Sequence, residues 1–360
     1  MATWRKEIAL GGVGLSVALV AGVFAFQKQI GAAIFERAVA SRVASGGGLA
    51  TVEDGLHVGL CGTGSPMPAV DRAGPCNLVI AGDQTFVIDA GEGAGEVLNR
   101  MGFNAATLNS ILLTHFHSDH IDGIGPLTLV FWTRGTSAEP LPVYGPKGVE
   151  TVVDGLNQFY ALDREHRIAH HGGEIVPISG GGAVARPFEM DGDRRVVLER
   201  DDLTITAFRV DHDPVEPALG YRFDYKGRSL CISGDTAKST NLEVACEGVD
   251  VLVHDALQPA MLKQVQDAWA RAGQDHIAQI MFDIQDYHAS PEEAAESAQT
   301  VGARMLVLSH LVPPLQSAYF YPAFLRDASE RFDGTIVVGE DGMFFSMPSG
   351  GNSITKTSLF

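Results

Sequence analysis

The fold is decided by residues 114–120, THFHSDH, which follow the apolar run SILL at 110–113. Such a run predicts a β-strand, so three imidazoles and one carboxylate should lie in a loop at its carboxyl end, where open α/β sheets bind ligands. Neutral imidazole and carboxylate groups are the usual protein ligands of zinc. These side chains can serve two ions if His115 and His117 face one ion while Asp119 and His120 face the other. The stretch therefore predicts a dinuclear metal site.

Three further candidate ligands stand at the ends of later predicted strands. His212 ends the run at 203–212, Asp235 lies in the turn after SLCISGD, and His310 ends MLVLSH at 305–310. Taken singly, Asp235 also fits a helix N-cap and His310 a hydrogen-bonded core histidine. Together they supply the three ligands that the first cluster lacks.

Short apolar runs broken by Gly, Asp and Pro begin near His57 and predict strands, and helical stretches separate the later ones. This order predicts one α/β domain with stacked sheets over residues 51–347, followed by a flexible tail over 348–360. Residues 163–200 lack a regular pattern, and we expect them to form an active-site rim or a homodimer contact. The strands are predicted at 56–62, 77–82, 85–91, 110–115, 141–146, 203–212, 249–256, 305–310 and 334–347, and the helices at 147–162, 258–272 and 290–303.

The four cysteines are an even number, which permits two disulfides. Their spacing contains no CxxC-like pair that would indicate a zinc site or a redox centre. We expect most of them to be buried as small apolar residues. They are Cys61, Cys76, Cys231 and Cys246.

The combination of HxHxDH, a strand-end His, SGDT at 233–236 and a final LSH resembles the metallo-β-lactamase superfamily. It is most similar to the branch that contains ribonuclease Z, metallo-type arylsulfatases and small zinc phosphodiesterases. GTGSP at 62–66, VYGP at 143–146 and GYR at 220–222 add to the match. The resemblance covers residues 56–345 and implies an αββα sandwich.

Carried over by position, the resemblance implies two zinc ions, with manganese or iron as other metals for the same ligands. One ion would be held by His115, His117 and His212. The other would be held by Asp119, His120 and His310, with Asp235 bridging the two. Flavodiiron proteins have an acidic residue where His117 stands, so a redox di-iron site is disfavoured.

The resemblance also implies a pair that handles protons. In ribonuclease Z-like enzymes, a Glu in an HEAT segment orients a His in an HST segment, and that His protonates the leaving oxygen. The matching segments here are HDAL at 254–257 and HAS at 288–290, so Asp255 would orient His288 as general acid. Asp is shorter than Glu, and His288 could instead cap the helix at 290–303 or face solvent. Asp119 joins these two as a catalytic candidate.

The balance of 44 acidic against 26 basic residues gives a formal charge of −18. Nucleic-acid binding depends on clustered Lys and Arg, so the charge disfavours nucleic acid as a partner. Bacterial ribonuclease Z that processes tRNA carries a long basic arm where residues 220–229 form only a predicted hairpin. The segment at 64–79 is similar to that of the arylsulfatase-like members instead.

We therefore expect the chain to cleave small phosphodiesters or sulfate esters, using water that the two metals activate. The alternatives are tRNA 3′-end processing, hydrolysis of carboxylic esters or lactones, and a catalytically idle, membrane-tethered binding module. An idle module would have no reason to keep seven convergent ligands.

The N-terminus holds an uncharged run at residues 8–26, after a flank at 1–7. Because about 20 apolar residues span a bilayer, the run predicts a transmembrane anchor. A cleaved signal with a site near AVAS at 38–41 and a buried core helix are the alternatives. Residues 27–50 would form a stem and linker, and we expect the catalytic domain on the extracytoplasmic, periplasmic side of the membrane.

Overall fold

A computed structural model describes residues 24, 26–44, 49, 52–135 and 137–360. The chain divides into two compact units, Met1–Ala50 and Thr51–Phe360, and each is described by itself.

The first unit contains helix α2 (Gln27–Ala44), in the region expected to form a stem. This helix has 18 residues, four of them charged in the sequence, so it does not meet the requirement for a membrane span. Within the described part of the chain, no helix is both long and apolar enough to cross a bilayer. The predicted anchor at 8–26 lies outside the described residues, apart from Phe24 and Phe26. The fold class is corrected accordingly: the transmembrane helix, and the single-pass, extracytoplasmic localisation that rested on it, are not supported.

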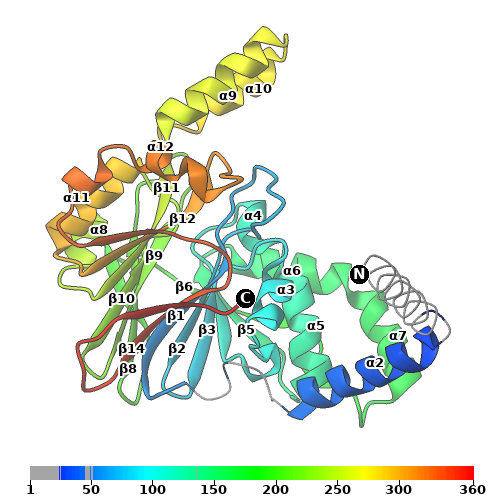
Figure 1. The fold of residues 1–360 in the computed structure, drawn as a ribbon. Coiled ribbons are helices and arrows are strands. Elements are labelled where there is room, and N and C mark those ends of the chain that lie inside the picture. Colours follow the sequence, from blue (N-terminus) through cyan, green and yellow to red (C-terminus); the bar gives the residue numbers. More distant parts are fainter. Residues whose placement is uncertain (1–23, 25, 45–48, 50–51, 136) are drawn as a thin grey trace, which may run out of the picture. The chain divides into compact units, whose positions relative to one another are not determined.

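The second unit is built on two sheets that face each other (Figure 1). The eight-stranded sheet has the order β15-β14-β1-β2-β3-β4-β5-β6, and the seven-stranded sheet has the order β13-β12-β11-β10-β9-β8-β7. The strands are β1 (Gly55–Gly62), β2 (Cys76–Ala81), β3 (Gln84–Ile88), β4 (Ser110–Leu112), β5 (Leu141–Pro146), β6 (Ala183–Phe188), β7 (Arg194–Arg200), β8 (Leu203–Arg209), β9 (Leu219–Tyr225), β10 (Arg228–Ile232), β11 (Val251–Leu257), β12 (Met305–Val312), β13 (Thr335–Val338), β14 (Met343–Pro348) and β15 (Thr355–Ser358).

Helices pack on the outer face of each sheet, which confirms the predicted αββα arrangement, and the second unit has ten α-helices among its described residues. They are α3 (Ala94–Arg100), α4 (Ser118–Ile121), α5 (Ile124–Gly135), α6 (Val149–Phe159), α7 (Ala161–His171), α8 (Thr240–Ala245), α9 (Pro259–Arg271), α10 (Asp275–Asp283), α11 (Pro291–Val301) and α12 (Tyr321–Leu325). Helices α3, α5 and α6 pack on the eight-stranded sheet, and α8 and α11 on the other. Helix α11 begins with a capping box between Ser290 and Glu293, which satisfies two backbone N–H groups at its start.

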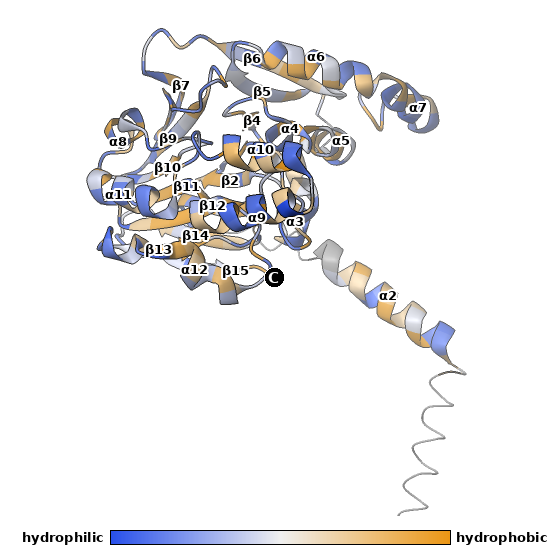
Figure 2. Ribbon diagram, turned by 90° about the horizontal axis from the view of Figure 1, so that it is seen from above, coloured by the Kyte–Doolittle hydropathy of each residue, from blue (hydrophilic) through white to orange (hydrophobic). Residues whose placement is uncertain are grey.

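The main hydrophobic core lies between the two sheets. It contains Val58 and Phe86 from one sheet and Phe223 and Val253 from the other, all buried. The rings of Phe86 and Phe223 are 6.1 Å apart, so the sheets are in direct contact through aromatic side chains. Figure 2 shows the inner strands mainly in hydrophobic colours, whereas α9 and α10 carry both colours.

Strand direction brings the predicted ligands to one edge. Strands β3 to β6 are parallel, and so are β10 to β13. Strand β9 is antiparallel to both β8 and β10, so β8 and β10 also run the same way. The carboxyl ends of β8, β10 and β12 therefore meet at the same edge of their sheet.

Three segments differ from the sequence-based expectations. Residues 163–200 are largely regular, because they contain most of α7 together with β6 and β7. The segment after α9 forms a second helix, α10, and Figure 1 shows both helices standing out beyond the strand ends. In the expected tail, residues 355–358 form β15, which pairs with β14.

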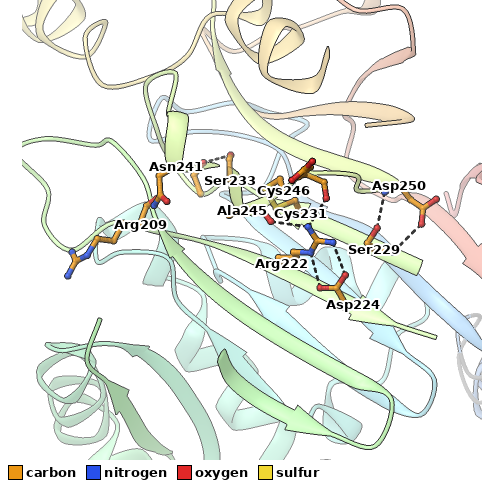
Figure 3. The surroundings of a disulfide bond; sticks show 12 residues. Arg209, Arg222, Asp224, Ser229, Cys231, Ser233, Asn241, Ala245, Cys246 and Asp250 are labelled. Atoms are coloured by element: carbon orange, nitrogen blue, oxygen red, sulfur yellow. Dashed lines mark hydrogen bonds and ion pairs between the residues drawn. A yellow bond between two sulfur atoms is a disulfide. The ribbon is translucent and has the colours of Figure 1, made fainter. Parts of the chain in front are cut away.

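All four cysteines are buried, as expected for most of them, and all four form disulfides, which their even number permitted. Cys61–Cys76 joins β1 to β2, and Cys231–Cys246 joins β10 to the end of α8. Beside the second bond, the Arg222 guanidinium pairs with Asp224 and donates to the carbonyl of Ala245 at 2.9 Å (Figure 3). The disulfide and this arginine tie α8 to the sheet from two sides.

Candidate metal centre

The seven predicted ligands come together from four strand ends. His115, His117, Asp119 and His120 follow β4, the last two within the short helix α4. His212 follows β8, Asp235 follows β10, and His310 lies near the end of β12. The backbone of His310 has φ of +47°, in the left-handed region that non-glycine residues rarely occupy. Such strain is concentrated at functional sites.

Two groups of donor atoms form within this set. Within each group, one donor atom per residue lies within 4.8 Å of the others. The first group is His115, His117, His212 and Asp235, and the second is Asp119, His120 and His310. In the second group, Asp119 Oδ2 is 3.3 Å from His310 Nε2 and 3.6 Å from His120 Nε2.

The Asp235 carboxylate lies between the two groups. Its Oδ2 is 3.2 Å from Nε2 of His120, 3.2 Å from Nε2 of His310 and 3.8 Å from Nε2 of His115. A carboxylate in contact with histidines of both groups is placed to bridge two cations. This is the geometry that the resemblance implies for Asp235.

The chemistry of the donors fits divalent metal ions. Nε2 of His115 and Nδ1 of His117 approach to 3.0 Å, and a cation between them would allow both nitrogens to act as acceptors. His212 binds the backbone oxygen of Tyr287 through Nδ1 at 3.0 Å, which leaves its buried Nε2 without a hydrogen-bond partner among the described residues. Unpaired buried nitrogens are costly unless a ligand satisfies them. Imidazole and carboxylate donors suit zinc in particular.

Burial sets the protonation of the first group. It lowers the pKa of His115 well below its ordinary value, and it also lowers the pKa of His117 and of His212. These rings are therefore neutral near pH 7, which is the form that binds a cation. For His120, burial is outweighed by the carboxylates of Asp235 and Asp89, which raise its pKa. His120 is thus the histidine at which metal and proton compete most.

Asp89 orients the metal loop and was missed by the sequence analysis. Its carboxylate accepts hydrogen bonds from Nδ1 of His120 at 2.9 Å and from both N and Oγ1 of Thr114 at 2.8 Å. A partner of this kind fixes which nitrogen of a ligating histidine faces the metal. The available signal was an acidic residue closing the strand TFVIDAG, in the same position as the later ligands.

His288 and Asp255 meet, although Asp is shorter than Glu. His288 Nδ1 is 2.9 Å from Asp255 Oδ2, and both residues are buried. Burial would raise the pKa of Asp255, but the neighbouring His254 and His288 lower it, so the carboxylate is ionised. With Nδ1 held in this way, Nε2 is the nitrogen of His288 available for chemistry. His288 also groups with Asp235 and His310 within 4.8 Å, so the same position would allow it to touch a metal.

A cavity of about 770 Å³ adjoins the metal loop. Ser118, Asp119 and Asp122 line it on one side, and the loop after β1 lines it on another. Arg72, within that loop, is already engaged, because it donates to Thr63 Oγ1 and to the carbonyl of Gly339 at 2.6 Å each. The cavity wall contains seven carboxylate residues but only two arginines; the carboxylates are Asp71, Glu92, Glu96, Asp119, Asp122, Glu340 and Asp341.

Comparison with known proteins places this architecture in a family. A family model described as the beta-lactamase superfamily domain matches residues 84–311. Ribonuclease Z of Mycolicibacterium gilvum is 35% identical over 292 residues, which cover 79% of this chain and 94% of that protein. Ribonuclease Z of Mycobacterium bovis is 35% identical over 289 residues, covering 79% and 96%.

Solved structures share the fold at lower identity. The short form of human tRNase Z superposes with a TM-score of 0.59 at 21% identity, covering 81% of this chain and 99% of that one. The metallo-beta-lactamase fold protein YhfI of Bacillus subtilis gives 0.56 at 19% identity, with 81% and 99% coverage.

The fold and its donor set together define a metal-dependent hydrolase. The chain belongs to the beta-lactamase superfamily and, within it, to the ribonuclease Z family. The resemblance seen in the sequence is thereby confirmed, and divalent metal binding follows from the fold.

Proposed function

We propose that the chain hydrolyses phosphodiester bonds with a pair of zinc ions, and that RNA is the first substrate class to test. The observation that carries this proposal is the His288–Asp255 contact of 2.9 Å beside a complete set of metal donors. The names of the curated relatives support RNA. They weigh against our exclusion of nucleic acid on charge alone, and nothing in them supports sulfate esters.

In this proposal, the metal pair would be held by His115, His117 and His212 on one side, by Asp119, His120 and His310 on the other, and by Asp235 between them. When bound, the metals would lower the pKa of water and neutralise charge on the phosphoryl oxygens.

The protein's own proton chemistry centres on His288. Its Nε2 would give a proton to the departing oxygen, and the ionised Asp255 at Nδ1 would orient the ring. Asp89 would hold His120 in the tautomer that directs Nε2 towards Asp235.

A second candidate substrate, a small phosphodiester, is favoured by two observations. Strands β9 and β10 are joined by a tight turn at Lys226 and Gly227, with no arm to hold tRNA. The cavity beside the metal loop is rich in carboxylates, which repel a polyanion.

Parallel assays of the purified, zinc-loaded protein on a precursor tRNA and on bis(4-nitrophenyl) phosphate test the proposal. Cleavage at the tRNA 3′ end would establish the RNA substrate, whereas turnover of the small ester alone would select the second candidate. The metal content of the same sample should be measured, so that a lack of activity is not caused by missing zinc. A fully loaded protein that cleaves neither substrate would refute the phosphodiesterase assignment.

A further inference from the structure

A half-buried tyrosine, Tyr287, lies between a proposed metal ligand and the proposed proton donor. Its ring centroid is 4.6 Å from that of His212, at an interplanar angle of 82°, and 4.9 Å from that of His288, at 60°. A side chain in contact with both groups borders the space in which a substrate bond would break.

Two features hold Tyr287 in this place. Its backbone carbonyl accepts the hydrogen bond from Nδ1 of His212 at 3.0 Å. The segment also emerges from the base of the α9–α10 hairpin, where Leu262 and Met281 pack on Leu257 and Val312 from the ends of β11 and β12. The hairpin is therefore anchored to the strands that carry Asp255 and His310.

The side chain of Tyr287 remains available to a ligand. Its ring remains partly accessible, and no hydrogen bond to its phenol oxygen is found among the described residues. The tyrosine is therefore not wholly enclosed by the protein, although it lies beside His212 and His288. Neither the metal donors nor the His288–Asp255 pair requires an aromatic residue here.

We propose that Tyr287 forms a subsite for a flat aromatic ring, the nucleobase or aryl group on the leaving side of the phosphodiester. The inference rests on the proposed function, because the departing oxygen must approach Nε2 of His288, and Tyr287 lies beside that ring. Stacking on an aromatic side chain tolerates different bases, since every base has a π-face. The subsite selects ring-bearing leaving groups without reading their sequence.

The first test measures binding, independently of turnover. The metal-loaded full chain is titrated calorimetrically with phenylphosphonate and methylphosphonate, which share an anionic head and differ in the ring. We expect the wild type to bind phenylphosphonate about 10-fold more tightly. Tyr287→Ala should remove that preference, and Tyr287→Phe should keep it, because the ring and not the hydroxyl makes the contact.

Two further variants isolate the ring from the fold. Tyr287→Leu keeps apolar bulk without aromaticity and should lose the preference while retaining the wild-type metal content. Phe282→Ala removes an exposed aromatic side chain from α10, five residues before Tyr287, and should leave the preference unchanged. If the wild type shows no preference for the ring, or if Tyr287→Leu retains it, the subsite does not exist.

A kinetic comparison places the ring on the leaving side. The substrates are two short RNAs that differ only in the nucleotide supplying the leaving oxygen, intact in one and abasic in the other. Tyr287→Ala should raise KM about 10-fold for the intact RNA and leave that of the abasic RNA unchanged. Equal effects on both would overturn the leaving-side assignment. A wild type that shows the phosphonate preference but cleaves no phosphodiester would refute the proposed function and leave the subsite standing.

Discussion

The proposed two-metal arrangement would depend on Asp235, because its carboxylate contacts histidines from both donor groups. Asp235→Ala should reduce bound metal from about two ions per chain to one or fewer, and activity about 100-fold or more. Elemental analysis of the purified variant provides the measurement. Asp202→Asn, an exposed substitution, is the control. If Asp235→Ala still binds two ions tightly, Asp235 does not bridge the metals.

His288 is the residue assigned to proton transfer. His288→Ala should lower kcat by about 10²–10⁴-fold, because the leaving oxygen would depart without a proton. The loss of kcat should be smaller for substrates that release nitrophenolate, because this group departs readily without being protonated. Steady-state kinetics on esters of graded leaving-group pKa make the comparison. Losses of equal size across the series, or a parallel loss of metal, would show that His288 acts as a ligand instead.

Asp54 links stability to pH outside the metal centre. Hydrogen bonds from Lys226, Ser349 and Tyr225 lower the pKa of Asp54 from 3.8 to about 2. A carboxyl group with a depressed folded-state pKa stabilises the protein above its unfolded pKa and loses that effect as the pH falls towards its folded pKa. The urea midpoints of wild type and Asp54→Asn should therefore differ at pH 5 and converge between pH 4 and 2. The exposed Asp83→Asn should show no such pattern.

At the scale of elements, sequence reasoning succeeded where a segment makes its own hydrophobic pattern. The run at 305–310 lies within β12, and the capping box before residue 291 begins α11. Sequence reasoning failed where a segment becomes a strand only by pairing with a neighbouring strand. The exposed residues TKTS of β15 have no apolar face, and their strand exists because β14 offers them partners. Residues 275–283 form α10, a helix that the sequence analysis did not predict, and it packs on α9.

The disulfide between β10 and α8 should stabilise its region mainly by shortening the unfolded chain. Cys231 and Cys246 are 15 residues apart, and a loop of that length corresponds to about 3 kcal/mol. The double variant Cys231→Ala/Cys246→Ala should lose roughly that much unfolding free energy in urea titrations. Reductant should lower the unfolding free energy of the wild type at least as much, because it breaks Cys61–Cys76 as well. An unchanged midpoint in both would contradict this prediction.

At the scale of the whole molecule, the convergence of the candidate ligands could be predicted because each of them ends or follows an apolar strand. The parallel order of the strands then brings the ends together, as for His212 and Asp235. Substrate class could not be predicted from a charge of −18, because a bulk charge does not describe the field beside bound cations. Asp89 and Tyr287 were also hidden, since their roles depend on contacts between distant segments.

The distribution of ligands over the two sheets has a thermodynamic consequence. Four of the candidate ligands follow a strand of the eight-stranded sheet, and three belong to the seven-stranded sheet. Ions that bind both sets bind only the folded chain, so chelation should lower Tm by roughly 5 °C or more. Calorimetry before and after dialysis against EDTA, with zinc added back, measures the change. An unchanged Tm would mean that the sheets hold together without help from the metals.

Bound at these donors, a metal pair would link the two sheets as well as form the reaction centre. A chain folded where zinc is scarce would open more often between its sheets and meet proteases in that state. Its lifetime would therefore follow metal supply, and only loaded molecules would persist. Because both sheets supply metal donors, metal-free chains would be degraded faster than metal-loaded ones without the help of another protein that distinguishes them.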